Sequence, residues 1–150
     1  MKKSELFNGY LESLQDKKIL ENLNQHKSIH LNGLTGSLAS ILGAACFKLS
    51  EKASIFILND KEEAAYFHND LEQFIPENDL LFYPGSYRRP YQIEETDNAN
   101  ILMRAEVLNR LSSQRKSSCI VTYPDAIFEK VITKKELNKN TLKLSVGEGI

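Results

Sequence analysis

The sequence contains no tryptophan, two cysteines and three histidines in 150 residues. Cys46 and Cys119 lie in apolar contexts without a histidine or second cysteine at metal-ligand spacing, so we interpret both as buried, reduced thiols and predict no metal site. No apolar run approaches the roughly 20 residues that span a bilayer. The N-terminus has lysines but lacks the apolar core of a signal peptide. These absences predict a soluble, cytoplasmic chain without a membrane partner.

Neither sign of charge dominates the chain. Its 19 Lys and Arg residues against 20 Asp and Glu residues give a formal net charge of −1. This balance excludes a protein whose whole surface is built to bind nucleic acid, although a local basic patch stays possible. The hydrophobic content of 41% is enough for a packed core of one ordinary domain.

The apolar spacing predicts strands and helices in alternation. We expect a helical segment over residues 1–27, then strands at 28–34, 53–59, 80–83 and 118–123, each followed by a helix. Asp60 and Glu63 have the spacing of a capping box at the start of the second of these helices. Four strand–helix units predict an α/β fold, in which a parallel sheet has helices on both faces.

The predicted domain organisation follows from a change of composition near residue 132. The α/β domain is expected over 28–132, after which a polar, basic connector leads to the alternating pattern TLKLSV at 141–146. We therefore interpret 133–150 as a linker and the start of a truncated second domain, and the chain as a fragment of a longer protein.

The stretch GLTGSLAS has the place, but not the residues, of a phosphate-binding loop. Such a loop reads G-x-x-x-x-G-K-[ST] between a strand and a helix. Gly33 and Ser40 occupy the first and last positions, but Leu38 replaces the second glycine and Ala39 the lysine. The backbone can then no longer curl around the phosphates, and the fixed cation is missing. We expect no nucleotide cofactor here, and at most a weak anion site at the helix N-terminus. The loop residues are Gly33, Thr35, Gly36, Ser37, Leu38, Ala39 and Ser40.

A second candidate is the loop YPGSYRRPYQ at 83–92. Its tyrosines and arginines could stack on bases or hold a nucleic-acid backbone. The same residue types are enriched at protein interfaces, so docking of another domain or partner is an equal possibility, as is a plain solvated loop. The candidate contact residues are Tyr87, Arg88, Arg89 and Tyr91.

Nothing in the sequence indicates catalysis. His26, His30 and His68 have no carboxylate or cysteine at ligand or triad spacing, and no nucleophile elbow is present. We predict no catalytic residue and no enzymatic activity for this chain.

Four segments, taken in order, resemble the N-terminal region of bacterial transcription-repair coupling factors over about residues 28–150. They are GLTGSLASIL, FILNDKEEAAYFHNDLEQFIPEN, LLFYPGSYRRPYQ and NILMRAEVLNRLSSQRKSSCIVTYPDAIFEKV. That region is similar in turn to the first helicase-like domain of the excision nuclease subunit UvrB. The resemblance implies a degenerate, RecA-like P-loop helicase fold.

The same resemblance implies the function of the longer protein. A transcription-repair coupling factor is an ATP-dependent DNA translocase that displaces RNA polymerase stalled at DNA lesions. It recruits nucleotide excision repair by binding UvrA. The ATP and Mg sites of its motor lie downstream of the region matched here, so the chain would be a non-catalytic module that contacts other domains of the same protein.

The resemblance also implies that two features of UvrB are reduced or missing in this chain. In UvrB the region matching 83–97 carries an aromatic hairpin that inserts into damaged DNA, whereas here the loop is short and retains only Tyr83, Tyr87 and Tyr91. Most of the UvrA contact surface would belong to the next domain, of which residues 138–150 look like the beginning. The alternative is a nucleic-acid-binding or ATP-binding domain of a UvrB-like excision-repair helicase.

Overall fold

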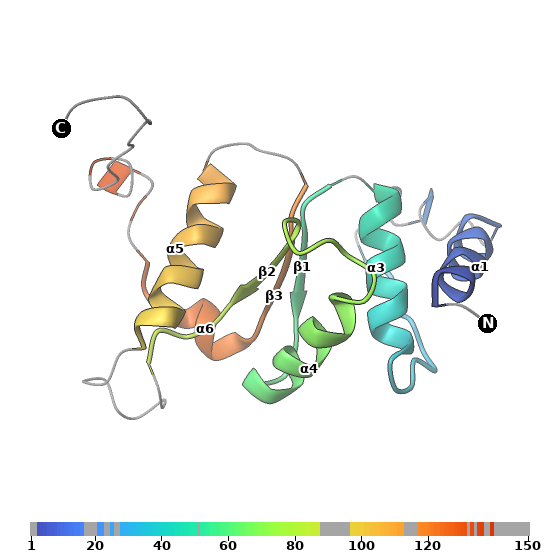
Figure 1. Cartoon of the computed structure of the whole chain (residues 1–150), viewed down its shortest axis with the longest axis horizontal. Coiled ribbons are helices and arrows are strands. Elements are labelled where there is room, and N and C mark those ends of the chain that lie inside the picture. Colours follow the sequence, from blue (N-terminus) through green and yellow to red (C-terminus); the bar gives the residue numbers. More distant parts are fainter. Residues whose placement is uncertain are drawn as a thin grey trace.

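The computed structural model describes residues 3–16, 21–22, 25, 28–50, 52–87, 97–112, 117–131, 133, 135–136 and 139. From α3 onward, helices and strands alternate along the chain, as the sequence predicts (Figure 1). The elements are α1 (Lys3–Asp16), α3 (Leu38–Ser50), β1 (Ser54–Ile57), α4 (Lys61–Leu71), β2 (Leu80–Tyr83), α5 (Asn98–Ser112), β3 (Cys119–Thr122) and α6 (Pro124–Phe128).

The three strands form one parallel sheet in the order β1-β3-β2. Cys119 of β3 lies opposite Ser54 of β1 on one side and Leu80 of β2 on the other. Parallel neighbours need a crossover, and here α4 and α5 supply it. The predicted α/β class with a parallel sheet is confirmed.

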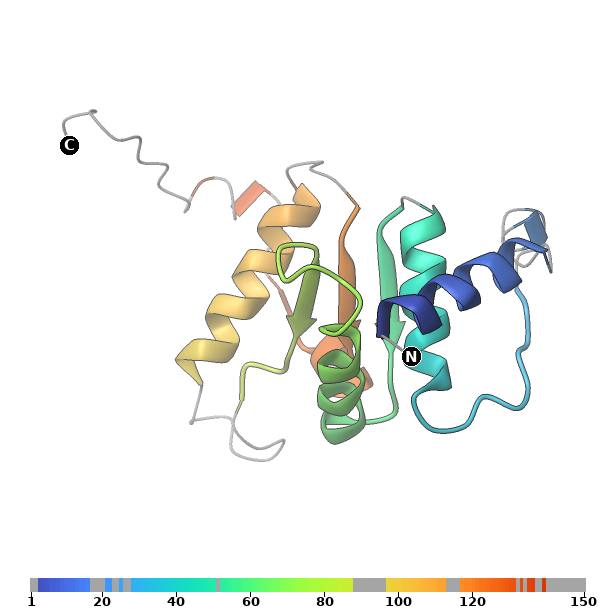
Figure 2. The ribbon, with the colours of Figure 1, turned by 45° about the vertical axis from the view of Figure 1, so that its right-hand side comes forward.

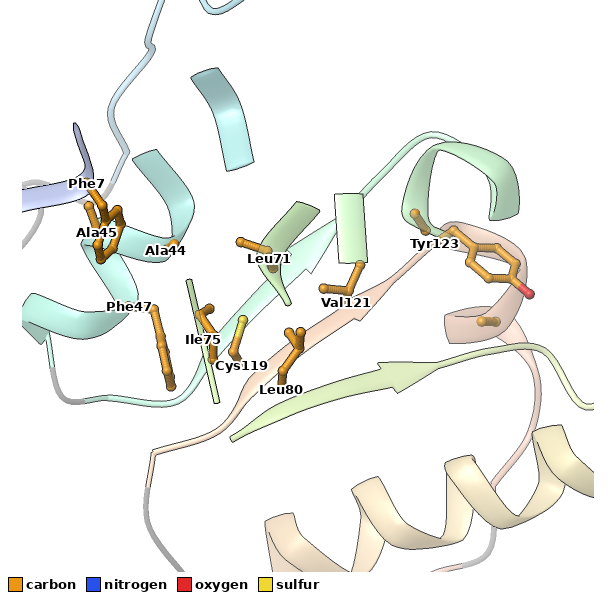
Figure 3. Packing of buried hydrophobic residues seen from close by; sticks show 12 residues of the cluster. Phe7, Ala44, Ala45, Phe47, Leu71, Ile75, Leu80, Cys119, Val121 and Tyr123 are labelled. Carbon is orange, nitrogen blue, oxygen red and sulfur yellow. The ribbon is translucent and has the colours of Figure 1, made fainter. Parts of the chain in front are cut away.

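Helices cover both faces of the sheet. Alternate residues of β3 point to opposite sides, so Cys119 and Val121 join the larger core under α3 and α4, while Ile120 packs with Val107 of α5 on the other face. Figure 2 shows α5 and α3 on opposite sides of the strands. Figure 3 shows the larger core, in which side chains of β2 and β3 face α3 and α4, away from α5.

The predicted N-terminal helical segment is present as α1, which packs on the domain through Phe7 and Leu11. Phe7 is buried, and its ring stacks on Phe74 with centroids 5.0 Å apart. The Lys48 ammonium of α3 lies over the same ring, 5.4 Å from its centroid. The limits of the proposed segments at residues 27 and 132 stay predictions.

The predicted strand at 28–34 is wrong. Residues 28–35 form no strand, and Leu31 and Leu34 are 42% and 39% exposed. A strand needs a neighbour to satisfy its backbone groups, and within the described ranges the only neighbour of β1 is β3. The alternation of apolar and polar residues around Ile29 and Leu31 is short, and this segment does not pair with a strand of the sheet.

The helix expected after the strand at 80–83 is present as α5, but most of the apolar residues at helical spacing in it do not form its buried face. Ile101, Leu102 and Leu111 are exposed, and the buried residues are Asn100, Arg104 and Val107. The helix turns a partly polar stripe toward the sheet because loop carbonyls beside β2 and β3 provide hydrogen-bond partners for Asn100 and Arg104. The strand predicted at 141–146 lies outside the described residues.

Both cysteines are free thiols, as predicted, although only Cys119 is fully buried and Cys46 is half-buried. Burial raises the pKa of the Cys119 thiol to about 12, so this thiol is protonated at neutral pH. In the part of the chain that the structure describes, no helix has the length and hydrophobicity needed to cross a bilayer.

Candidate functional site

The glycine loop leads into α3 without a strand before it. Gly33 and Gly36 have φ values of 82° and 56°, in the left-handed region that favours glycine. The turn that contains Gly36 is closed by the Leu38 N–H, which donates to the Thr35 carbonyl at 3.3 Å. Residues 30–37 are exposed, and a Cβ added at either glycine would meet no atom within 4 Å. The loop therefore encloses no preformed cradle.

Ser40, at the position where a P-loop hydroxyl would bind Mg²⁺, points elsewhere. Its side chain is buried, and its hydroxyl donates to the Asp70 carboxylate of α4 at 2.9 Å. This contact ties α3 to α4 across 30 residues of sequence. In a working loop the hydroxyl is a ligand of the nucleotide-bound metal. Here it is a donor within a helix pair, and the neighbouring carboxylate would repel a phosphate.

Leu38 and Ala39 are half-buried at the start of α3. Neither side chain carries a charge that could face a nucleotide. Of the loop features identified from the sequence, the structure retains the glycine conformations and the helix start. Among the residues whose contacts are described, none places a positive charge at this loop.

A polar cluster that the sequence did not reveal lies at the carboxyl ends of β2 and β3. Its centre is Arg104 of α5, which is 6% exposed. One guanidinium nitrogen, Nη1, donates to the carbonyls of Pro84 at 2.7 Å and Ala126 at 3.0 Å. The guanidinium also lies over the Tyr83 ring, 4.3 Å from its centroid. Arg104 therefore joins the loop after β2 to the helix after β3.

Glu129 completes this cluster. Its carboxylate lies 3.6 Å from Arg104 Nη1 and accepts hydrogen bonds from both the backbone N–H and the hydroxyl of Ser86. The second Arg104 nitrogen, Nη2, is buried and has no hydrogen-bond partner among the residues that the structure describes. An arginine that is desolvated in this way depends strongly on its carboxylate partner.

Two further hydrogen bonds fix Gly85. Its N–H donates to the Tyr123 hydroxyl at 2.8 Å, and its carbonyl accepts from the Asn100 amide at 2.9 Å. Burial is the main cause that raises the pKa of Tyr83 and Tyr123, so both phenols are neutral at physiological pH. The beginning of the 84–97 loop is thus rigidly held.

The contact residues predicted in this loop are only partly placed. Tyr87 is half-buried, next to the Ser86 carbonyl that accepts from the Asp97 N–H at 2.8 Å. Arg88, Arg89 and Tyr91 lie outside the described residues, so their roles stay predictions. The one sequence signal for the cluster is an arginine within the helical pattern of 101–111, where a solvent-facing position is the usual interpretation.

The described residues bring no three His, Cys, Asp or Glu side chains together as metal ligands. Three features result: a glycine loop without a preformed phosphate site, a Ser40 hydroxyl that is bonded to Asp70, and a hydrogen-bonded start of the 84–97 loop. Together they offer packing surfaces.

Comparison with known proteins gives one partial similarity. No family model and no solved structure matches the chain. Over 98 residues, 65% of its length, the chain is 26% identical to a transcription-repair-coupling factor of Rickettsia bellii. The matched region is 9% of the Rickettsia protein, so the chain is similar to a small part of a much longer transcription-repair-coupling factor.

Proposed function

We propose that this chain is the non-catalytic N-terminal module of a transcription-repair coupling factor. The observation that carries the proposal is the similarity to one such factor over 65% of the chain. The hydrogen bond of Ser40 supports a non-catalytic role for the module, because the hydroxyl at the position that would bind Mg²⁺ donates to Asp70 instead. Displacement of RNA polymerase, DNA translocation and binding of UvrA are proposed for the full-length protein, with ATP and Mg²⁺ in its motor domains.

The module itself would act by packing. Its rigid loop stem and its sheet give fixed surfaces on which neighbouring domains of the same protein can rest. In this role the glycine loop is the connection that leads into α3, and its conformation needs no ligand.

The first test is nucleotide binding. Isothermal titration of the 150-residue chain with Mg-ATP should give no saturable heat, because the lysine is absent and Ser40 is engaged. The double change Leu38→Gly, Ala39→Lys should also fail to bind, since it leaves the Ser40–Asp70 contact and the missing strand unchanged. Saturable micromolar binding by the natural chain would contradict the proposal.

The second test concerns the loop at 84–97. We propose that Arg88, Arg89 and Tyr91 contact another domain or DNA from a loop whose stem is held by Arg104 and Glu129. The double change Arg88→Ala, Arg89→Ala should weaken any DNA binding seen by gel shift and lower its salt dependence by about two counterions. A matched pair of lysines on α3 and its following turn, Lys48 and Lys52, serves as control. Unaltered binding and salt slope would exclude the arginines as a DNA contact.

A further inference from the structure

Among the described residues, β2 pairs with β3 along one edge, and no strand pairs with its outer edge. The Cys119 N–H donates to the Asp79 carbonyl at 2.8 Å, so the backbone groups of Asp79, Leu81 and Tyr83 turn toward β3. The backbone groups of Leu80 and Phe82 point away from β3. The Leu80 N–H donates to the Pro76 carbonyl at 3.2 Å. Among the described residues, no loop or helix bonds the outer N–H and C=O of Phe82.

A hollow of about 290 Å³ lies along this edge, between α4 and α5, which we call the β2-edge hollow. Its apolar wall consists of strand residues and one methionine from α5. Its polar lining comes from α4, from the turn before β2 and from α5. The residues that decide its chemistry are Leu80, Phe82, Met103, Glu72, Glu77 and Glu106.

The rim of the hollow is negatively charged. Three glutamates face one arginine there, Arg110, which is already paired with Glu106 at 2.7 Å. His68 also lines the hollow. Burial lowers the pKa of His68, and the Glu72 carboxylate 3.4 Å away raises it by less, so His68 is mainly uncharged at neutral pH. Three carboxylates and one guanidinium leave a net charge of −2.

We propose that the β2-edge hollow binds an extended segment of a partner protein in which basic and apolar residues alternate. The backbone of such a segment pairs with Phe82, as an added strand. Every second side chain enters the apolar wall, and the others carry ammonium or guanidinium groups to the glutamates. The charge complementarity selects the occupant, because an acidic segment or a nucleic-acid backbone would meet like charges.

The position of the hollow fits this mode of binding. α4 and α5 lie on opposite faces of the sheet, so they flank the β2 edge without covering it. His68 packs edge-on against the Phe82 ring, with centroids 5.4 Å apart, and holds that ring beside the open backbone groups. The edge thus offers the backbone groups of Phe82 to an added strand.

The test uses three fluorescein-labelled peptides and the 150-residue chain. The first peptide is Lys-Val-Lys-Val-Lys-Val-Lys, the second has glutamate for every lysine, and the third has proline for the central valine. By fluorescence anisotropy at low salt, the first should bind about tenfold or more tightly than either other peptide, because charge and the backbone N–H are both required. Equal binding of the acidic peptide, or tighter binding of a DNA oligonucleotide, would overturn the proposal.

A pair of variants locates the site. Glu77→Lys, in the hollow, should weaken binding of the first peptide by about five- to tenfold, because a repulsion replaces an attraction. Glu62→Lys makes the same charge change in the exposed first turn of α4, outside the hollow, and should leave binding unchanged. Equal losses in both variants would reduce the interaction to non-specific attraction and contradict the proposal.

Hydrogen exchange separates strand addition from side-chain contact. Bound peptide should slow exchange of the Phe82 amide at least about tenfold, since that N–H gains a hydrogen bond. Binding that leaves the Phe82 amide unprotected would rule out pairing at this edge.

Discussion

Replacing Arg104 with methionine should lower the free energy of unfolding by about 3–5 kcal/mol, the largest effect we expect from a single polar residue. The change keeps much of the side-chain volume but removes the donor to Pro84 and Ala126. It also leaves Glu129, a mostly buried carboxylate, without its cation. Urea denaturation followed by circular dichroism measures this loss.

Arg110→Met in the same helix is the matched control. Arg110 is about one-third exposed, and its ion pair with Glu106 is half in solvent, so the loss there should be about 1 kcal/mol or less. The double change Arg104→Met, Glu129→Gln should recover part of the stability, because no unpaired charge is then buried. If Arg104→Met costs no more than Arg110→Met, the cluster does not stabilise the fold.

Leu71→Ala should destabilise the chain by about 2–5 kcal/mol, through lost burial and the cavity left behind. Leu71 ends α4 with no exposed surface, and its side chain lies in the larger core (Figure 3). Thermal and urea unfolding both report the change. Its control is Leu102→Ala on α5.

Leu102 is one of the apolar residues at helical spacing in α5, and it is 70% exposed. Its replacement by alanine should change the free energy of unfolding by no more than about 0.5 kcal/mol in either direction. A loss comparable to that of Leu71→Ala would mean that Leu102 is covered in solution.

The parts of the fold that the sequence predicts well are those determined by neighbours along the chain. The run containing Ile120 and Val121 is apolar on both sides because β3 is the central strand, buried by helices on each face. The N-cap at Asp60 is also local and is confirmed, since the Glu63 N–H donates to the Asp60 carboxylate at 2.8 Å. The reciprocal bond differs from that of a capping box, because the Glu63 carboxylate accepts from the N–H of Asn59, one residue before the N-cap, at 3.1 Å.

The parts that the sequence did not predict depend on contacts between distant segments. Arg104 looks solvent-facing until the carbonyl of Pro84, 20 residues earlier, and that of Ala126, 22 residues later, are brought to it. Ser40 resembles a metal ligand until Asp70 is placed beside it. The strand expected at 28–34 failed for the opposite reason, because its local pattern found no partner strand.

The strand order has a consequence for synthesis on the ribosome. β3 lies between β1 and β2, which do not pair with each other, yet it is the last of the three strands along the chain. Until residues 119–122 leave the exit tunnel, the two earlier strands have no partner in this sheet. Between the emergence of β1 and that of β3, the nascent chain therefore carries β1 and β2 without their shared neighbour, and these three strands can pair only once β3 has emerged.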